Sequence, residues 1–188
     1  MERGNVSQED DEFRALLDQY GILRRGAMEA PPRSKAFMVF AQRRDARVEA
    51  EVWRRHAAQF FDTELELALP KRYIFDAPPA DAARIRLTGP DGLEKTRLCF
   101  GRPREDDDLK TADEVDTRQG AAGLGRLAQR CSTVWLVVTE GDTDEAALRL
   151  AAILASVVLG PILSPDGQEL FGVRTARAKL EGTAAPYR

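Results

Sequence analysis

The sequence has little of the residue types on which most metal sites and many enzymes depend. Its 188 residues include one histidine, His56, and two cysteines, Cys99 and Cys131. So few ligands exclude the common His-rich and four-cysteine metal sites, and two thiols are too few for the disulfide framework of a secreted protein. We therefore expect no bound metal, no cofactor and reduced cysteines.

Long apolar runs and an export leader are also missing. The chain opens with Met-Glu-Arg-Gly-Asn and turns acidic at once, whereas a secretory leader needs a basic start and an apolar stretch. Its most apolar segment, Ala146 to Leu159, is interrupted by Arg149 and is shorter than the roughly 20 residues that a membrane-spanning helix requires. The sequence predicts a cytoplasmic protein without membrane insertion.

An excess of positive charge is absent as well. The formal net charge is -3, so nothing attracts a nucleic acid globally, and 43% apolar residues are too many for a disordered chain. Only five of the 28 cations are lysine, and this arginine bias together with many alanines indicates a GC-rich bacterial genome. We expect a folded bacterial protein for which nucleic acid is an unlikely partner.

Residues 1–34 have the pattern of an appendage. Ser7 and Asp10 are spaced like a capping box, and Pro31 and Pro32 favour an extended tether before the body of the chain. Between them, four apolar residues at the spacing of one helical face predict an amphipathic helix: Phe13, Leu16, Leu17 and Tyr20. Such a helix either packs on its own domain or binds a partner's groove or a second copy of the chain.

The body, residues 35–180, alternates strand and helix patterns, and residues 181–188 form a flexible tail. Periodicity predicts strands near 36–41, 65–69 with a continuation at 73–75, 84–87, 95–100, 134–138, 162–163 and 170–173. It predicts helices near 46–60, from about 118 or 124 to 130, near 146–159 and near 174–180. This order predicts a single α/β or α+β domain, a two-layer sandwich with a mixed, mostly antiparallel sheet and helices on one or both faces. The uninterrupted apolar run from Val134 to Val138 marks the centre of the sheet.

A hairpin around the turn at 88–92 carries the most distinctive charge pattern. Alternation places Ile85, Leu87, Leu98 and Phe100 toward the core, and on the other side, together with Cys99, four cations: Arg84, Arg86, Lys95 and Arg97. Like charges on neighbouring strands repel one another unless something anionic covers them. The cover is solvent and salt, an acidic segment of the chain itself (9–12 or 105–116), or another molecule, for which an acidic protein fits best.

The segment from Arg104 to Asp116 contains seven anions and two cations, which predicts a polar, mobile loop. Its run Asp106 to Asp108 lacks the ligand spacing of a calcium loop. The glycines between 120 and 125 fit neither a P-loop nor a dinucleotide-binding motif, because no apolar strand precedes them. We interpret these segments as solvated loops.

A recognisable catalytic set is lacking. His56 lies in the middle of a predicted helix with no nucleophile motif nearby. Cys99 shares its strand face with Lys95 and Arg97, whose charges favour a thiolate, while Glu64 and Glu66 offer carboxylates on another strand. We assign no catalytic residue.

The sequence therefore predicts a non-catalytic bacterial protein–protein interaction module: an adaptor, an immunity-type inhibitor or an assembly subunit. It would bind a protein partner, or a second copy, through the basic hairpin face, the N-terminal helix or both. The alternative is a small enzyme in which the fold brings Cys99 and His56 together with a carboxylate such as Glu64 or Glu66.

Overall fold

The structure is a computed structural model that describes residues 11, 13–24, 31–70, 81–141 and 144–182. It is a mixed α+β fold built on a seven-stranded sheet of order β2-β3-β4-β5-β1-β6-β7, and all six strand pairings are antiparallel. The strands are β1 (Ala36–Ala41), β2 (Glu64–Ala68), β3 (Asp81–Thr88), β4 (Glu94–Pro103), β5 (Thr133–Val138), β6 (Ile162–Leu163) and β7 (Leu170–Phe171). The predicted sandwich class is confirmed.

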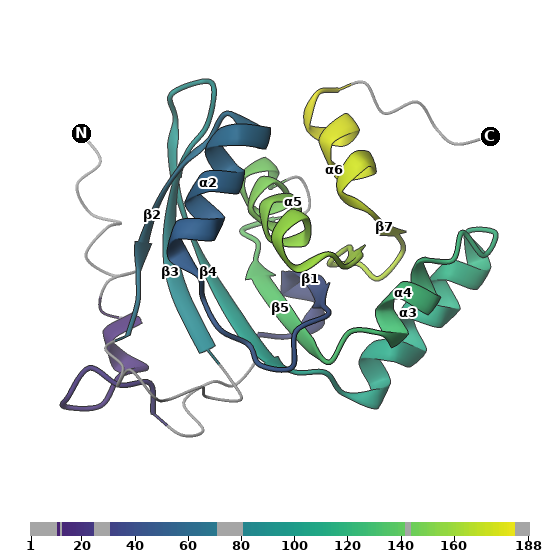
Figure 1. Cartoon of the computed structure of the whole chain (residues 1–188), viewed down its shortest axis with the longest axis horizontal. Coiled ribbons are helices and arrows are strands. Elements are labelled where there is room, and N and C mark those ends of the chain that lie inside the picture. The colour runs from purple at the N-terminus through teal and green to yellow at the C-terminus, as the bar shows by residue number, and fades with distance from the viewer. Residues whose placement is uncertain (1–10, 12, 25–30, 71–80, 142–143, 183–188) are drawn as a thin grey trace.

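Helices cover both faces of the sheet (Figure 1). They are α2 (Ala50–Phe61), α3 (Asp106–Arg118), α4 (Leu124–Gln129), α5 (Glu145–Val158) and α6 (Val173–Leu180), with a 3-10 turn η1 (Arg33–Lys35) before β1. One apolar cluster joins α2, α5 and α6 to the first face, and a second cluster joins α3 and α4 to the other. The sheet is therefore the middle layer, and we refer below to its α5 face and its α3 face.

The two most apolar strands lie at the centre of the sheet. β5 is the fourth of the seven strands and pairs with β4 and β1, as its uninterrupted apolar sequence predicted. All six residues of β1 are buried, since the strand is covered on both faces. Strands buried on two sides read as continuous apolar runs, which is why both were identified correctly from the sequence.

Both tryptophans of the chain meet in the core of the α5 face. Trp53 of α2 and Trp135 of β5 pack edge to face, with ring centroids 5.1 Å apart and an interplanar angle of 83°. Gly101 of β4 lies against this pair, because a Cβ atom there would come within 2.9 Å of the Trp135 ring. The absence of a side chain at residue 101 makes room for the indole.

The helix α5 leads directly into a close contact with β1. Its C-cap residue, Leu159, has a left-handed φ of 57°, and the chain then runs along β1, where the Phe40 amide donates to the Pro161 carbonyl at 3.0 Å. Between them, a Cβ atom on Gly160 would lie only 1.8 Å from the Phe40 carbonyl oxygen. Residue 160 must therefore be glycine for the segment to approach the strand.

The prediction of a mobile acidic loop at 104–116 is wrong, since most of the segment forms α3. The side chain of Glu105 accepts from the backbone amide of Asp108, and the Asp108 carboxylate accepts from the Glu105 amide, which is a complete capping box. Carboxylates in the first turn of a helix also interact favourably with its dipole. The acidic run at the start of this segment is therefore a helix start.

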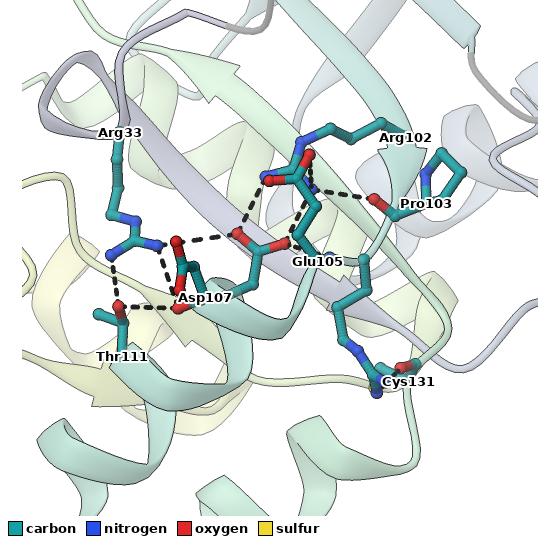
Figure 2. A network of polar contacts seen from close by, with 9 residues as sticks. Arg33, Arg102, Pro103, Glu105, Asp107, Thr111 and Cys131 are labelled. Carbon is teal, nitrogen blue, oxygen red and sulfur yellow. Dashed lines mark hydrogen bonds and ion pairs between the residues drawn. The ribbon is translucent and has the colours of Figure 1, made fainter.

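Asp108 also anchors α3 to the rest of the fold, through a polar network whose members Arg33, Arg102 and Thr111 are labelled in Figure 2. Its buried carboxylate accepts two hydrogen bonds from the Arg102 guanidinium, at 2.7 and 2.9 Å, and lies 3.8 Å from the Arg33 guanidinium. Arg33 additionally donates to the Thr111 hydroxyl and to the Asp107 carbonyl. The network ties η1, the end of β4 and the first turn of α3 together.

The predicted N-terminal helix is shorter than the apolar spacing indicated. Among the described residues, helical conformation covers 11 and 13–15, after which the chain turns and Leu17 pairs with Leu23 in an isolated antiparallel bridge. The Asp18 carboxylate accepts from the amides of Tyr20 and Ile22, at 2.8 and 3.0 Å. This local turn competes with continuation of the helix, so Tyr20 does not share a helical face with Phe13.

Several sequence-based predictions lie outside the described residues. They are the helix start at Ser7 and Asp10, the tether at 25–30, the strand continuation at 73–75 and the tail beyond residue 182. The short hairpin of β6 and β7 and the helix α6 are present as expected. Within the part of the chain that the structure describes, no helix has both the length and the apolar character to cross a bilayer.

Candidate functional site

An open groove lies between the β3–β4 turn and the first turns of α5. Its volume is about 380 Å³, and it is lined by Leu87, Gly89, Asp91, Leu93, Lys95, Arg97, Glu140, Gly141, Asp144, Glu145, Ala146 and Arg149. The turn brings β3 and β4 to one side of the groove, and the residues before and after the α5 N-cap form the other. We call this feature the hairpin groove.

A buried ion pair forms the floor of the hairpin groove. Arg97 of β4 donates to both carboxylate oxygens of Asp144, at 2.7 and 2.9 Å, and the two side chains are only 6% and 5% exposed. Asp144 is the N-cap of α5 and accepts from the Ala147 amide, while the more exposed Glu140 contacts Arg97 at 2.9 Å. The pair clamps the edge of β4 to the start of α5.

This clamp shifts the titration of Asp144. Burial by itself raises the pKa of the Asp144 carboxyl, but hydrogen bonds from Arg97 and from the amides of Glu140 and Ala147 outweigh it, so the pKa is lowered overall. A carboxylate with a lowered pKa contributes stability above its unfolded-state pKa, and that contribution is lost as the pH falls through the folded-state pKa.

We therefore predict acid sensitivity that depends on Asp144. Urea unfolding of the chain and of Asp144→Asn should differ by a constant free energy from neutral pH down to about pH 4, below which the difference should shrink. The measurement is a series of unfolding curves at fixed ionic strength. A difference that stays constant down to pH 2.5 would contradict the role given to the carboxylate.

The groove is lined by both apolar and charged residues, and most of these charges are paired within the chain. Leu93, in the turn, has 60% of its surface exposed at the rim. Arg149 pairs with Glu145 at 2.6 Å and also lines an adjoining hollow of about 220 Å³, whose other lining residues are Phe61, Pro90, Arg177, Leu180 and Glu181. The two hollows form one extended surface running from the turn to α6.

The four cations of the predicted basic face do not share one face of the sheet, so that part of the prediction is corrected. β3 and β4 pair with Ile85 opposite Arg97 and Leu87 opposite Lys95, which places these residues together on the α5 face. Arg84 and Arg86 lie on the α3 face, with Leu98 and Phe100. The turn sets this register, and a shift of one residue in the pairing exchanges every side chain between the two faces.

Anionic groups of the chain itself pair with two of these four cations. Arg86 pairs with Glu66, directly opposite on β2, at 2.9 Å, and Arg97 pairs with Asp144. Arg84 is half-buried and also makes an interaction. Lys95 is exposed at the rim of the hairpin groove and has no ion-pair partner among the described residues.

The N-terminal residues singled out by the sequence have different environments. Phe13 is buried, and Leu16 packs against the apolar cluster of the α3 face. Leu17 is half-buried in its bridge to Leu23, while Tyr20 is 65% exposed in the turn. This segment packs on the chain's own sheet, the first of the two alternatives that the sequence left open.

His56 makes a structural contact with the helix beside it. Its Nδ1 lies 3.1 Å from the Ser156 hydroxyl oxygen, and that hydroxyl donates to the Ile153 carbonyl of its own helix at 2.6 Å. Since the hydroxyl proton is used there, Nδ1 is the donor in this contact. Nδ1 therefore does not act as a base toward Ser156, as it would in a nucleophile–base pair.

The structure does not assemble the alternative catalytic set. Cys99 is fully buried on the α5 face, whereas Glu64 and Glu66 project from the α3 side of β2, so the sheet separates them. Burial raises the pKa of the Cys99 thiol to about 12, although a hydrogen bond with the Ala83 backbone opposes the shift. Burial raises the pKa of Cys131 to about 11, with Arg104 opposing it. Neither thiol is activated as a nucleophile.

The glycine-containing loop before α4 is filled by a carboxylate of the chain itself. Asp116 of α3 accepts from the amides of Gly123 and Leu124, both at 3.3 Å. A Cβ atom on Gly125 would come within 3.2 Å of the same carboxylate. The loop thus caps α4 internally and is not arranged for a phosphate.

No group of three or more histidine, cysteine or acidic side chains that could hold a metal ion is found among the described residues. No known family model matches the chain, and comparisons with curated proteins and with solved structures find no match either. The site is therefore argued from its own geometry. Of the residues that line the groove and the adjoining hollow, the sequence singled out Lys95 and Arg97 as binding residues. It missed Leu93 and Pro90 of the β3–β4 turn and Arg149 of α5, because the turn and the helix are far apart in the sequence and form no motif.

Proposed function

We propose that the chain is a non-catalytic protein–protein interaction module, an adaptor or assembly subunit, whose partner docks in the hairpin groove. The observation that supports this proposal is an open hollow of about 380 Å³ with an exposed leucine, Leu93, at its rim. Concave surface with apolar lining and a few polar groups is typical of binding sites. The adjoining hollow of about 220 Å³ beside α6 extends this surface.

The charges of the groove favour a protein segment over a small charged ligand. Arg97 is bound to Asp144 and Arg149 to Glu145, so neither cation is free to fix a small anion. The apolar contacts of Leu93, Pro90 and Leu180 suit aliphatic side chains of a peptide. Lys95, at the rim, suits one acidic residue beside them.

The partner is therefore proposed to present a short segment with an aliphatic residue flanked by an acidic one. This narrows the expectation drawn from the sequence, in which four cations on one face attracted an acidic partner. Lys95 and Arg97 remain part of the proposed surface, and of its cations Lys95 is the one without an ion-pair partner among the described residues; the Asp91 carboxylate, which accepts from the Leu93 amide, also lines the groove. Arg84 and Arg86 belong to the other face of the sheet.

Photocrosslinking in the source organism tests the proposal. A crosslinking amino acid at Leu93 of the full chain should give one discrete protein adduct, and the same amino acid at Lys110, exposed on α3, should not. Lys95→Glu should weaken binding of the captured partner at least about tenfold, whereas Lys110→Glu should leave it unchanged. Equal adducts at both positions, or an adduct insensitive to Lys95→Glu, would refute docking in the hairpin groove.

A further inference from the structure

The N-terminal segment 13–24 is a small folded unit that satisfies its own polar groups. The Asp18 amide donates to the Ile22 carbonyl at 2.7 Å, and the Arg24 amide donates to the Leu16 carbonyl at 3.0 Å. The Arg24 side chain donates to the Leu17 carbonyl at 2.8 Å. These bonds close a compact turn within twelve residues of chain.

The segment is held on the body by apolar contacts. Phe13 is buried, and Leu16 and Leu23 pack against the cluster of the α3 face that includes Phe100, with Leu98 beside it. Among the described residues, no hydrogen bond or ion pair joins 13–24 to any other part of the chain. Apolar contacts are non-directional, so the segment can separate from the described part of the sheet without breaking a hydrogen bond to it.

The body is anchored independently just after the segment. Arg33 lies beside Asp108 and donates to Thr111 and to the Asp107 carbonyl, so the chain is fixed to α3 before β1 begins (Figure 2). β1 itself pairs with β5 along its full length. Release of segment 13–24 therefore does not disturb the central strands.

We propose that segment 13–24 is a detachable cover: it opens as one unit while the sheet stays folded, and the apolar face that it leaves accepts the same segment of a second copy. We choose a second copy of the chain as the partner that binds this face, because Leu16 and Leu23 of the segment already pack against the face within one chain. Exchange of identical elements between copies needs no new contacts. The covalent tether favours the closed form within one chain through its effective concentration.

Native-state hydrogen exchange tests the opening on the unmodified chain. The amides of Asp18 and Arg24, bonded only within the segment, should exchange about 100-fold or more faster than that of Leu136 in β5, with rates insensitive to low urea. Such a pattern defines local opening of the segment. Equal rates with the same urea dependence would show that the segment opens only with the whole fold, and would overturn the proposal.

A peptide added to the full chain tests docking between copies. In a Phe13→Ala, Leu16→Ala, Leu23→Ala variant the cover is released, and a labelled peptide of residues 11–24 should bind to it. A peptide with the same three substitutions should not bind, whereas Tyr20→Ala, which alters an exposed side chain, should bind normally. No binding of the unaltered peptide, or loss of β5 protection in the variant, would count against a detachable cover.

Discussion

Replacing Gly160 by alanine is expected to cost about 4 kcal/mol or more of folding free energy, the range in which single substitutions are exceptional. The added Cβ atom would lie 1.8 Å from the Phe40 carbonyl oxygen, which belongs to the backbone of a strand buried on both faces. Neither group is a flexible side chain that moves aside, so the segment after α5 would have to separate from β1. Urea unfolding measures the loss.

Gly172→Ala is the matched control, since nothing lies within 4 Å of a Cβ atom at that position and its backbone is extended. Its free energy of unfolding should stay within about 0.5 kcal/mol of the unmodified chain. A Gly160→Ala protein that is as stable as the Gly172→Ala protein would show that the close approach of residues 158–161 to β1 is not needed for folding.

Asp144→Ala is expected to destabilise the fold by about 3–5 kcal/mol, because it leaves the Arg97 guanidinium buried without its main partner. The substitution also removes the N-cap of α5, whose carboxylate accepts from the Ala147 amide. The result should be a lower midpoint of urea unfolding with an unchanged dependence of the free energy on urea.

The control for Asp144 is Glu140→Ala, which removes a carboxylate that also contacts Arg97. Glu140 is 60% exposed, so its pair is screened by solvent and its loss should cost about 1 kcal/mol or less. Asp144→Asn, which keeps a capping group but removes the charge, should fall between the two alanine variants. A Glu140→Ala effect as large as that of Asp144→Ala would contradict the assignment of Asp144 as the principal partner.

The central strands and the core helix α5 could be predicted because each of their sequences is compatible with only one type of secondary structure. Strands buried on both sides require continuous apolar runs, and Val134 to Val138 has no polar residue. The helix α5 is apolar almost all round, and Gly160 and Pro161 just beyond it mark its C-terminal end. In these elements local preference and tertiary burial agree.

The acidic helix α3 could not be recognised from charge alone. Its buried residues include two aspartates, Asp108 and Asp116, so the apolar stripe that identifies a helix is interrupted. Asp108 is buried because Arg102 and Arg33 lie against it, and Asp116 because it caps α4. The groups that contact these two aspartates lie in other elements, and no local pattern in the sequence predicts those contacts.

The β3–β4 hairpin shows a different limit of sequence-based prediction, because the register of the strand pairing could not be deduced from the sequence. The alternation of apolar and charged residues in β3 and in β4 was read correctly within each strand. Which face of β4 joins which face of β3 depends on the conformation of the turn between Thr88 and Glu94. The prediction placed the pairing of β3 and β4 one residue out of register, and so put on one face two pairs of cations that lie on opposite faces of the sheet. For the same reason it did not identify the hairpin groove.

The edge-to-face pair of Trp53 and Trp135 has a practical consequence. The chain contains two tryptophans, and both are almost completely buried within the same layer, between α2 and the sheet. Tryptophan fluorescence, excited selectively, will consequently follow the melting of that layer and report little on α3, α4 and the N-terminal turn. Fluorescence titrations of α3 and α4 will require an introduced fluorophore.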